Sequence, residues 1–78
     1  MIARELREIL DRRPFRPIRI RISSGQYVDV AHPETVLLGS TMFSFVIPRK
    51  NGTYDMGWYN LVHVVKIEPL RLRKKRRA

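Results

Sequence analysis

The stretch PFRPIRIRISSGQYVDV, residues 14–30, decides the fold that this sequence predicts. After its second proline, isoleucine and arginine alternate over residues 18–22, which is the period-two pattern of a strand with one buried face. The letters SSGQ then supply a turn, and residues 27–30 return with two valines on one face. The segment therefore predicts an antiparallel hairpin with one apolar side and one positively charged side.

The residues that precede this hairpin predict an amphipathic helix. In MIARELREILDRR, residues 1–13, the apolar positions recur at helical spacing, at Ile2, Leu6, Ile9 and Leu10. Pro14 ends the helix, because proline lacks an N–H donor and disfavours helical geometry in the residue before it. We expect a helix over about residues 2–13.

The residues that follow the hairpin predict further short strands. VLLG (36–39) is a short apolar strand, and TMFSFVIP (41–48) places Phe43, Phe45 and Ile47 on one face and Met42, Ser44 and Val46 on the other. Asn51-Gly52 is the strongest hairpin signal, since both residues tolerate positive φ in a tight primed turn, and the chain returns over residues 54–59. After a one-turn break, VVKIEPL (64–70) is the last strand. One helix followed by about five short strands predicts an α+β, mainly β fold, a small closed or nearly closed barrel.

Length and composition exclude several classes of protein. With 78 residues the chain forms one domain at most. It has no cysteine, and its two histidines, His32 and His63, lie far apart, so we expect no disulfide, no metal and no cofactor. Charges interrupt every apolar stretch before it reaches the length of a membrane span. We expect a cytoplasmic protein with no membrane contact.

The charge is concentrated at the C-terminus. The formal net charge is +9, from 16 basic and 7 acidic residues, yet six of the basic ones lie in RLRKKRR, residues 71–77. They leave 10 basic against 7 acidic residues in residues 1–70, a charge of only +3. We expect residues 71–78 to be a disordered tail. Its charge density favours an arm on a polyanion, with Arg71, Arg73, Lys74, Lys75, Arg76 and Arg77 on phosphates, and the alternative is a solvated terminus that aids solubility.

The overall pattern resembles the Sm-like fold, especially its bacterial RNA-chaperone (Hfq-type) branch. The resemblance rests on the N-terminal helix, on the first hairpin with Ile18, Ile20, Ile22 and Gly25, and on MGWYNLVHVVKIEPL. It implies a strongly bent, five-stranded antiparallel barrel over residues 1–70, and it points to RNA rather than DNA. Other SH3-like barrels share much of the same pattern.

A narrower resemblance covers three motifs. PFRPIRI, HPE and KIEPL, in this order, are similar to a group of small bacterial proteins of uncharacterised function. The chain departs from the RNA chaperones at Asn60 and Leu61, where those proteins carry a Lys-His or Arg-Gly type pair that helps to hold a nucleotide. AHPET also lacks their acidic loop pattern, so their uridine pocket is not carried over to this chain.

The arginines of the first hairpin are candidates for nucleic-acid binding. Three guanidinium groups about 7 Å apart along a strand suit a phosphate backbone, and a tyrosine nearby would stack on unpaired bases. The candidates are Arg16, Arg19 and Arg21, with Tyr27 or Tyr59 for stacking. The alternative is an ordinary exterior face, in which Asp29 and Glu68 pair with these arginines.

Trp58 lies in an aromatic cluster with Tyr54 and Tyr59, a pattern typical of a core or an interface. An open strand edge near residues 54–59 would pair with a neighbouring copy, so we expect a homo-oligomer through strand edges. No triad or paired acid and base is present in the sequence, and we expect no enzyme. The sequence thus predicts a non-catalytic nucleic-acid-binding protein, RNA being favoured, with a protein-interaction or homo-oligomeric assembly module as the alternative.

Overall fold

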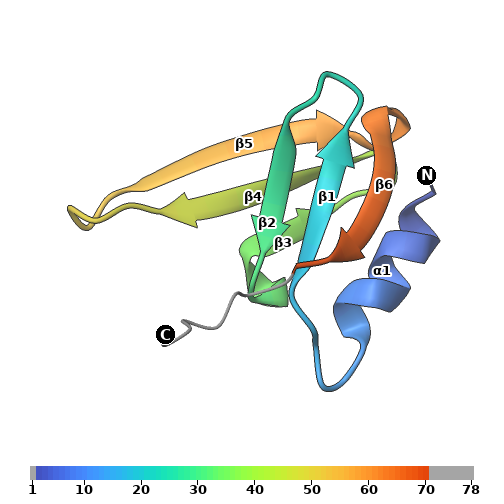
Figure 1. Cartoon of the computed structure of the whole chain (residues 1–78), viewed down its shortest axis with the longest axis horizontal. Coiled ribbons are helices and arrows are strands. Elements are labelled where there is room, and N and C mark those ends of the chain that lie inside the picture. The colour runs from blue at the N-terminus through green and yellow to red at the C-terminus, as the bar shows by residue number, and fades with distance from the viewer. Residues whose placement is uncertain (1, 71–78) are drawn as a thin grey trace, which may run out of the picture.

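The chain forms one helix followed by six strands, in a computed structural model that describes residues 2–70 (Figure 1). Two single turns of 3-10 helix interrupt the strands, η1 after the second strand and η2 before the last one. The bounds are α1 Ala3–Asp11, β1 Ile18–Ile22, β2 Tyr27–Val30, η1 Pro33–Thr35, β3 Val36–Leu38, β4 Met42–Pro48, β5 Tyr54–Asn60, η2 Leu61–His63 and β6 Val64–Pro69.

The strands form two separate three-stranded antiparallel sheets, in the orders β2-β1-β6 and β3-β4-β5. The mainly β, α+β class is confirmed, whereas the expected five-stranded closed barrel is not what the described residues form. The chain leaves one sheet at η1, where Pro33 has no N–H to donate, and returns at η2. η1 separates β2 from β3, so that β2 belongs to one sheet and β3 to the other.

The β1–β2 and β4–β5 hairpins each turn through three residues, the last of which is a glycine of positive φ. In the first, Ile22 N donates to Gln26 O at 2.9 Å, with Gly25 at φ 98°. In the second, Arg49 N donates to Thr53 O at 2.8 Å, with Gly52 at φ 83°. The predicted two-residue primed turn at Asn51-Gly52 is wrong, since no non-glycine residue between 2 and 70 has positive φ.

The inner faces of the two sheets and one side of α1 share a single apolar core. The isoleucines of β1 are buried against Val28 and Val30, while Phe43 is the largest fully buried side chain of the other sheet. Figure 1 shows α1 beside the β2-β1-β6 sheet, next to β6. The core comprises Leu6, Leu10, Ile18, Ile20, Ile22, Val28, Val30, Phe43, Leu61 and Val64.

The helix is shorter than the predicted 2–13, because it ends at Asp11. Arg12 is already extended, with φ −62° and ψ 139°. Pro14 disfavours helical geometry in the residue before it, so the helix ends upstream of Arg13 rather than beside the proline. No helix within residues 2–70 is long and apolar enough to span a membrane.

The β4–β5 hairpin extends past the core, as Figure 1 shows. Its ladder runs from the pair Met42–Asn60 to the pair Pro48–Tyr54. Near the core end Phe43 is buried, whereas toward the turn Ile47 and Tyr54 are exposed on opposite faces. The hairpin therefore presents apolar side chains to solvent over much of its length.

Candidate functional site

The outer face of β2-β1-β6 carries the charged residues of the first hairpin. Arg19 lies opposite Asp29 in the register of β1 with β2. Its Nε donates to Asp29 Oδ1 at 2.7 Å and its Nη2 donates to Oδ2 at 3.0 Å, so the pair is bidentate. This hydrogen bond with Asp29 is the main reason that the pKa of Arg19 is raised above its ordinary value.

Arg21 pairs with the third strand of the same sheet. Its Nε donates to Glu68 Oε2 at 2.8 Å, and Lys66 Nζ lies 3.4 Å from the other oxygen of that carboxylate. The hydrogen bond from Arg21 is the main cause of the lowered pKa of Glu68, although partial desolvation opposes it. The pairing of both arginines with acidic neighbours, weighed above as the alternative to nucleic-acid contact, is thus present.

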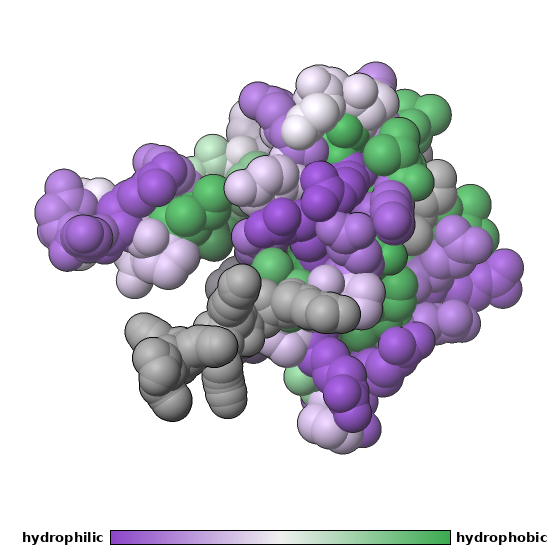
Figure 2. All heavy atoms as spheres, in the orientation of Figure 1, coloured by the Kyte–Doolittle hydropathy of each residue, from purple (hydrophilic) through white to green (hydrophobic). Residues whose placement is uncertain are grey.

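Tyr27 completes this face. The guanidinium carbon of Arg19 lies 4.0 Å from the centre of the tyrosine ring, and that of Arg21 lies at 5.9 Å. The residue keeps 51% of its surface exposed. Figure 2 shows the resulting face of β2-β1-β6 as predominantly hydrophilic. The face thus presents one exposed ring beside two arginines.

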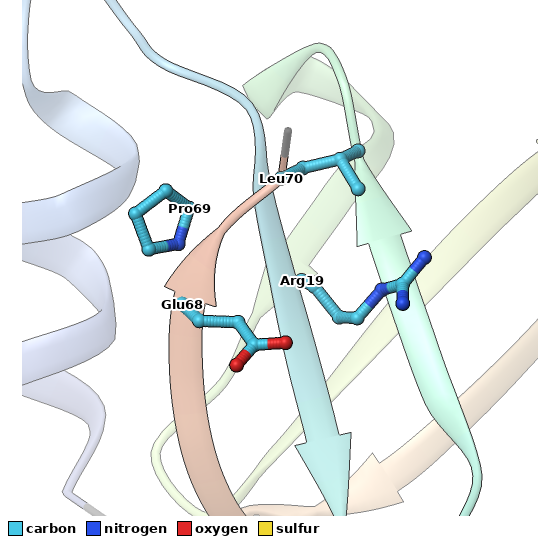
Figure 3. A pocket seen from close by; sticks show the side chains of 4 residues that line it. All are labelled: Arg19, Glu68, Pro69 and Leu70. Atoms are coloured by element: carbon cyan, nitrogen blue, oxygen red, sulfur yellow. The ribbon is translucent and has the colours of Figure 1, made fainter. Parts of the chain in front are cut away.

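A hollow of about 390 Å³ lies at the end of this face, lined by Arg19, Glu68, Pro69 and Leu70 (Figure 3). Arg19 extends toward β2 and the carboxylate of Glu68 lies over β1, which matches their ion pairs with Asp29 and Arg21. The predicted basic tail, residues 71–78, lies outside the described residues.

Two of the predicted site residues do not lie on this face. Arg16 precedes β1 and lines a separate groove, together with Ile9 of α1 and Arg12, which follows the helix. It does not share the face of Arg19, because the two residues are three positions apart and strand side chains alternate with period two. Tyr59 is half-buried: its ring stacks on Phe45 at 5.8 Å and its hydroxyl donates to Gln26 Oε1 at 2.6 Å. Tyr59 is therefore part of the packing around the core.

The outer face of β3-β4-β5 is apolar and exposed. Trp58 is 65% exposed and Leu37 is 75% exposed, on either side of the small Ser44, which pairs with both in the strand register. All side chains of this face are uncharged. We call it the apolar face; it comprises Leu37, Met42, Ser44, Val46, Pro48, Tyr54, Met56, Trp58 and Asn60.

The apolar face contains a hollow of about 420 Å³. Leu37 and Trp58 form its walls, and Ser44 lies between them with Met42 at one end. Further along the hairpin, Met56 is exposed on the same face. A hollow and a projecting side chain thus occur on one uncharged surface.

Sequence reasoning singled out Trp58 but missed Leu37, Met42 and Met56. For Met42 the signal was available in residues 41–48, where three of the four positions on its face, Met42, Val46 and Pro48, are apolar although only the other face of the strand packs on the core. The open edge of β5 near Trp58 agrees with the predicted edge, because β5 is the last strand of its sheet.

Neither histidine lies in a strand, since His32 precedes η1 and His63 is the last residue of η2. No group of three or more His, Cys, Asp or Glu residues in this part of the chain could hold a metal ion. Within HPE, the carbonyl of His32 accepts from Thr35 N at 3.1 Å and Thr35 Oγ1 at 2.7 Å, so the motif builds the turn of η1. Comparison of the chain with protein-family models, curated proteins and solved structures finds no match.

Proposed function

We propose that this protein is a non-catalytic protein-interaction module that binds other protein subunits through the apolar face. The observation that carries the proposal is the exposure of Leu37, Met56 and Trp58 on a face without a charged side chain. Exposed apolar surface of this extent marks an interaction site, because burying it on a partner releases water at a gain of about 25 cal/mol per Å². The outer face of β2-β1-β6, with its ion pairs, would remain in contact with water when the apolar face binds a partner.

Site-specific photo-crosslinking in cells tests this proposal. A benzophenone amino acid at Met56 places the probe on the apolar face, and the same probe at Val62 is the control, since Val62 is equally exposed in η2. We expect protein adducts from position 56 that are absent from position 62. Equal yields from both positions, or none from 56, would remove the basis of the proposed function.

A second candidate function is binding of nucleic acid, with RNA favoured over DNA. The observation in its favour is Tyr27, which is exposed beside Arg19 and Arg21 and could stack on an unpaired base. The charge of residues 71–77 adds sequence-independent attraction to phosphates. Asp29 and Glu68 compete with phosphate for both guanidinium groups, which is why this candidate ranks second.

Fluorescence anisotropy with single-stranded RNA and duplex DNA tests the second candidate across a salt series. The full chain is compared with a version that ends at Leu70 and with Asp29→Asn, which releases Arg19 from its carboxylate. If the tail neutralises six phosphates on a single strand, the slope of log K against log salt is about −4. Binding that survives truncation and strengthens in Asp29→Asn would assign a site to the β2-β1-β6 face.

The proposal also includes the fold family of the chain. An Sm-like or SH3-like barrel is supported by the sheet orders β2-β1-β6 and β3-β4-β5, which follow one meander bent at η1, with β6 returning to β1. An experimental structure in which β2 and β3 do not follow one bent course through η1, or in which β6 does not pair with β1, would count against this kinship.

A further inference from the structure

We infer that the partner of the apolar face is a second copy of this chain, related to the first by a two-fold axis. This inference rests on the proposed function of the apolar face and names its occupant. Three properties of the face carry it: its area, its lack of charge and its shape.

The area fits a dimer of ordinary size. From the exposed fractions of Leu37, Met42, Tyr54, Met56 and Trp58, the accessible surface of these five residues is roughly 700 Å² per copy. Two copies face to face would bury about 1,400 Å², which lies within the roughly 1,200–2,000 Å² of specific, stable interfaces. The face alone is therefore large enough, without a contribution from the rest of the molecule.

The lack of charge removes the main obstacle to self-association. Two copies of a chain with a net charge of +9 repel each other, and burial of an unpaired charge would add a large desolvation cost. The apolar face presents no charge to its own copy. Near the turn of the hairpin, Arg49 and Asp55 pair with each other. Two copies can therefore meet through their apolar faces without breaking an ion pair of the β2-β1-β6 face.

The shape of the face suits a two-fold contact, in which each copy offers the same surface to the other. The row of Leu37, Ser44 and Trp58 is hollow, and the next row along the strands holds Val46 and Met56. We place the two-fold axis in the plane between the β3-β4-β5 sheets of the two copies. It runs across the strands and midway between these two rows, so that each row lies over the other row of the partner copy. Met56 then packs against the Trp58 of the second copy, a contact that the flexible, polarisable thioether favours.

Sedimentation and light scattering of the purified full chain test the inference. We expect the wild type to have twice the mass of one chain at micromolar concentration. Leu37→Asp should raise the dimer dissociation constant by at least about a hundredfold, because the symmetry buries the new carboxylate twice. Val62→Asp is the matched control, since this valine is 71% exposed in η2, and it should leave the dimer intact. Circular dichroism checks that both variants keep the fold.

The position of the axis has its own test. The chain has no cysteine, so Ser44→Cys and Val46→Cys each introduce a unique thiol. A mixture of the two variants under mild oxidation should form disulfide-linked heterodimers faster than either variant forms homodimers, since each row faces the other. Equal rates would overturn this axis.

The outcomes separate the inference from the proposed function. A monomeric wild type, or equal effects of Leu37→Asp and Val62→Asp, overturns the dimer. If the probe at Met56 then still forms adducts with a different protein, the proposed function stands and only its partner changes. If it forms none, both are wrong.

Discussion

Truncation of Leu6 tests whether α1 belongs to the cooperative core. Leu6 is 0% exposed and packs in the cluster that the two sheets share. Leu6→Ala removes three carbon atoms, worth about 2.5 kcal/mol in transfer free energy. The cavity left behind raises the expected loss to about 3–4 kcal/mol. For a domain of this size, that corresponds to a fall in Tm of about 15–25 °C.

The assay is urea unfolding followed by far-UV circular dichroism. It is best done in the Leu37→Asp background, where the free energy of unfolding is that of a single chain and does not depend on protein concentration. Ile2→Ala is the control, because Ile2 is exposed at the start of the same helix and should cost less than about 1 kcal/mol.

A total stability of about 4–12 kcal/mol leaves Leu6→Ala close to the limit of folding. Leu6→Val, which removes one methylene, therefore supplies a milder second point at about 1 kcal/mol. If Leu6→Ala costs no more than Ile2→Ala, α1 is not part of the core and the reasoning fails.

Three further changes have defined outcomes. Gly57→Ala should cost about 1–3 kcal/mol in the same urea assay, because its Cβ would lie 2.7 Å from Cζ of Phe45, and a cost near zero would mean that the ring moves freely. Gly52→Ala should cost about 1–2 kcal/mol, since φ is 83° there, and a turn that accepts alanine without loss would contradict the left-handed geometry. Because the hydrogen bond from Arg21 lowers the pKa of Glu68 below its ordinary 4.5, the pair stabilises the fold above that pH and is lost as pH falls through the lowered value. Glu68→Gln should therefore lower Tm at neutral pH and match the wild type in acid, and an equal Tm difference at both pH values would argue against the ion pair.

The fold was predictable where one local pattern decided the structure. IRIRI alternates so regularly that only one face can be buried, and β1 has this burial pattern. All six strand segments were recognisable from their apolar residues, but their division into two sheets was less accessible, because the effect of the break that Pro33 creates between β2 and β3 depends on tertiary packing. The turn at Asn51-Gly52 shows the same limit: the glycine is in the left-handed region as its residue type favours, but the loop takes three residues.

The candidate site was predictable only in part. The pairing of Arg19 and Arg21 with Asp29 and Glu68 followed from charges on neighbouring strands, and the structure confirms it. The apolar face was harder to find, since a strand that is apolar on both sides can lie inside a core as well as on a surface. Only the packing of the β4–β5 hairpin past the core decides between the two.

The inner faces of both sheets share one core, so their outer faces point away from each other. One of these carries ion pairs and the other is apolar, so a single chain, without the second copy that would cover β3-β4-β5, is amphiphilic. At an air bubble, a plastic wall or a hydrophobic resin, it should adsorb by β3-β4-β5 and orient β2-β1-β6 toward water. An adsorbed layer would then expose Tyr27 and Asp29 to the solution in every molecule.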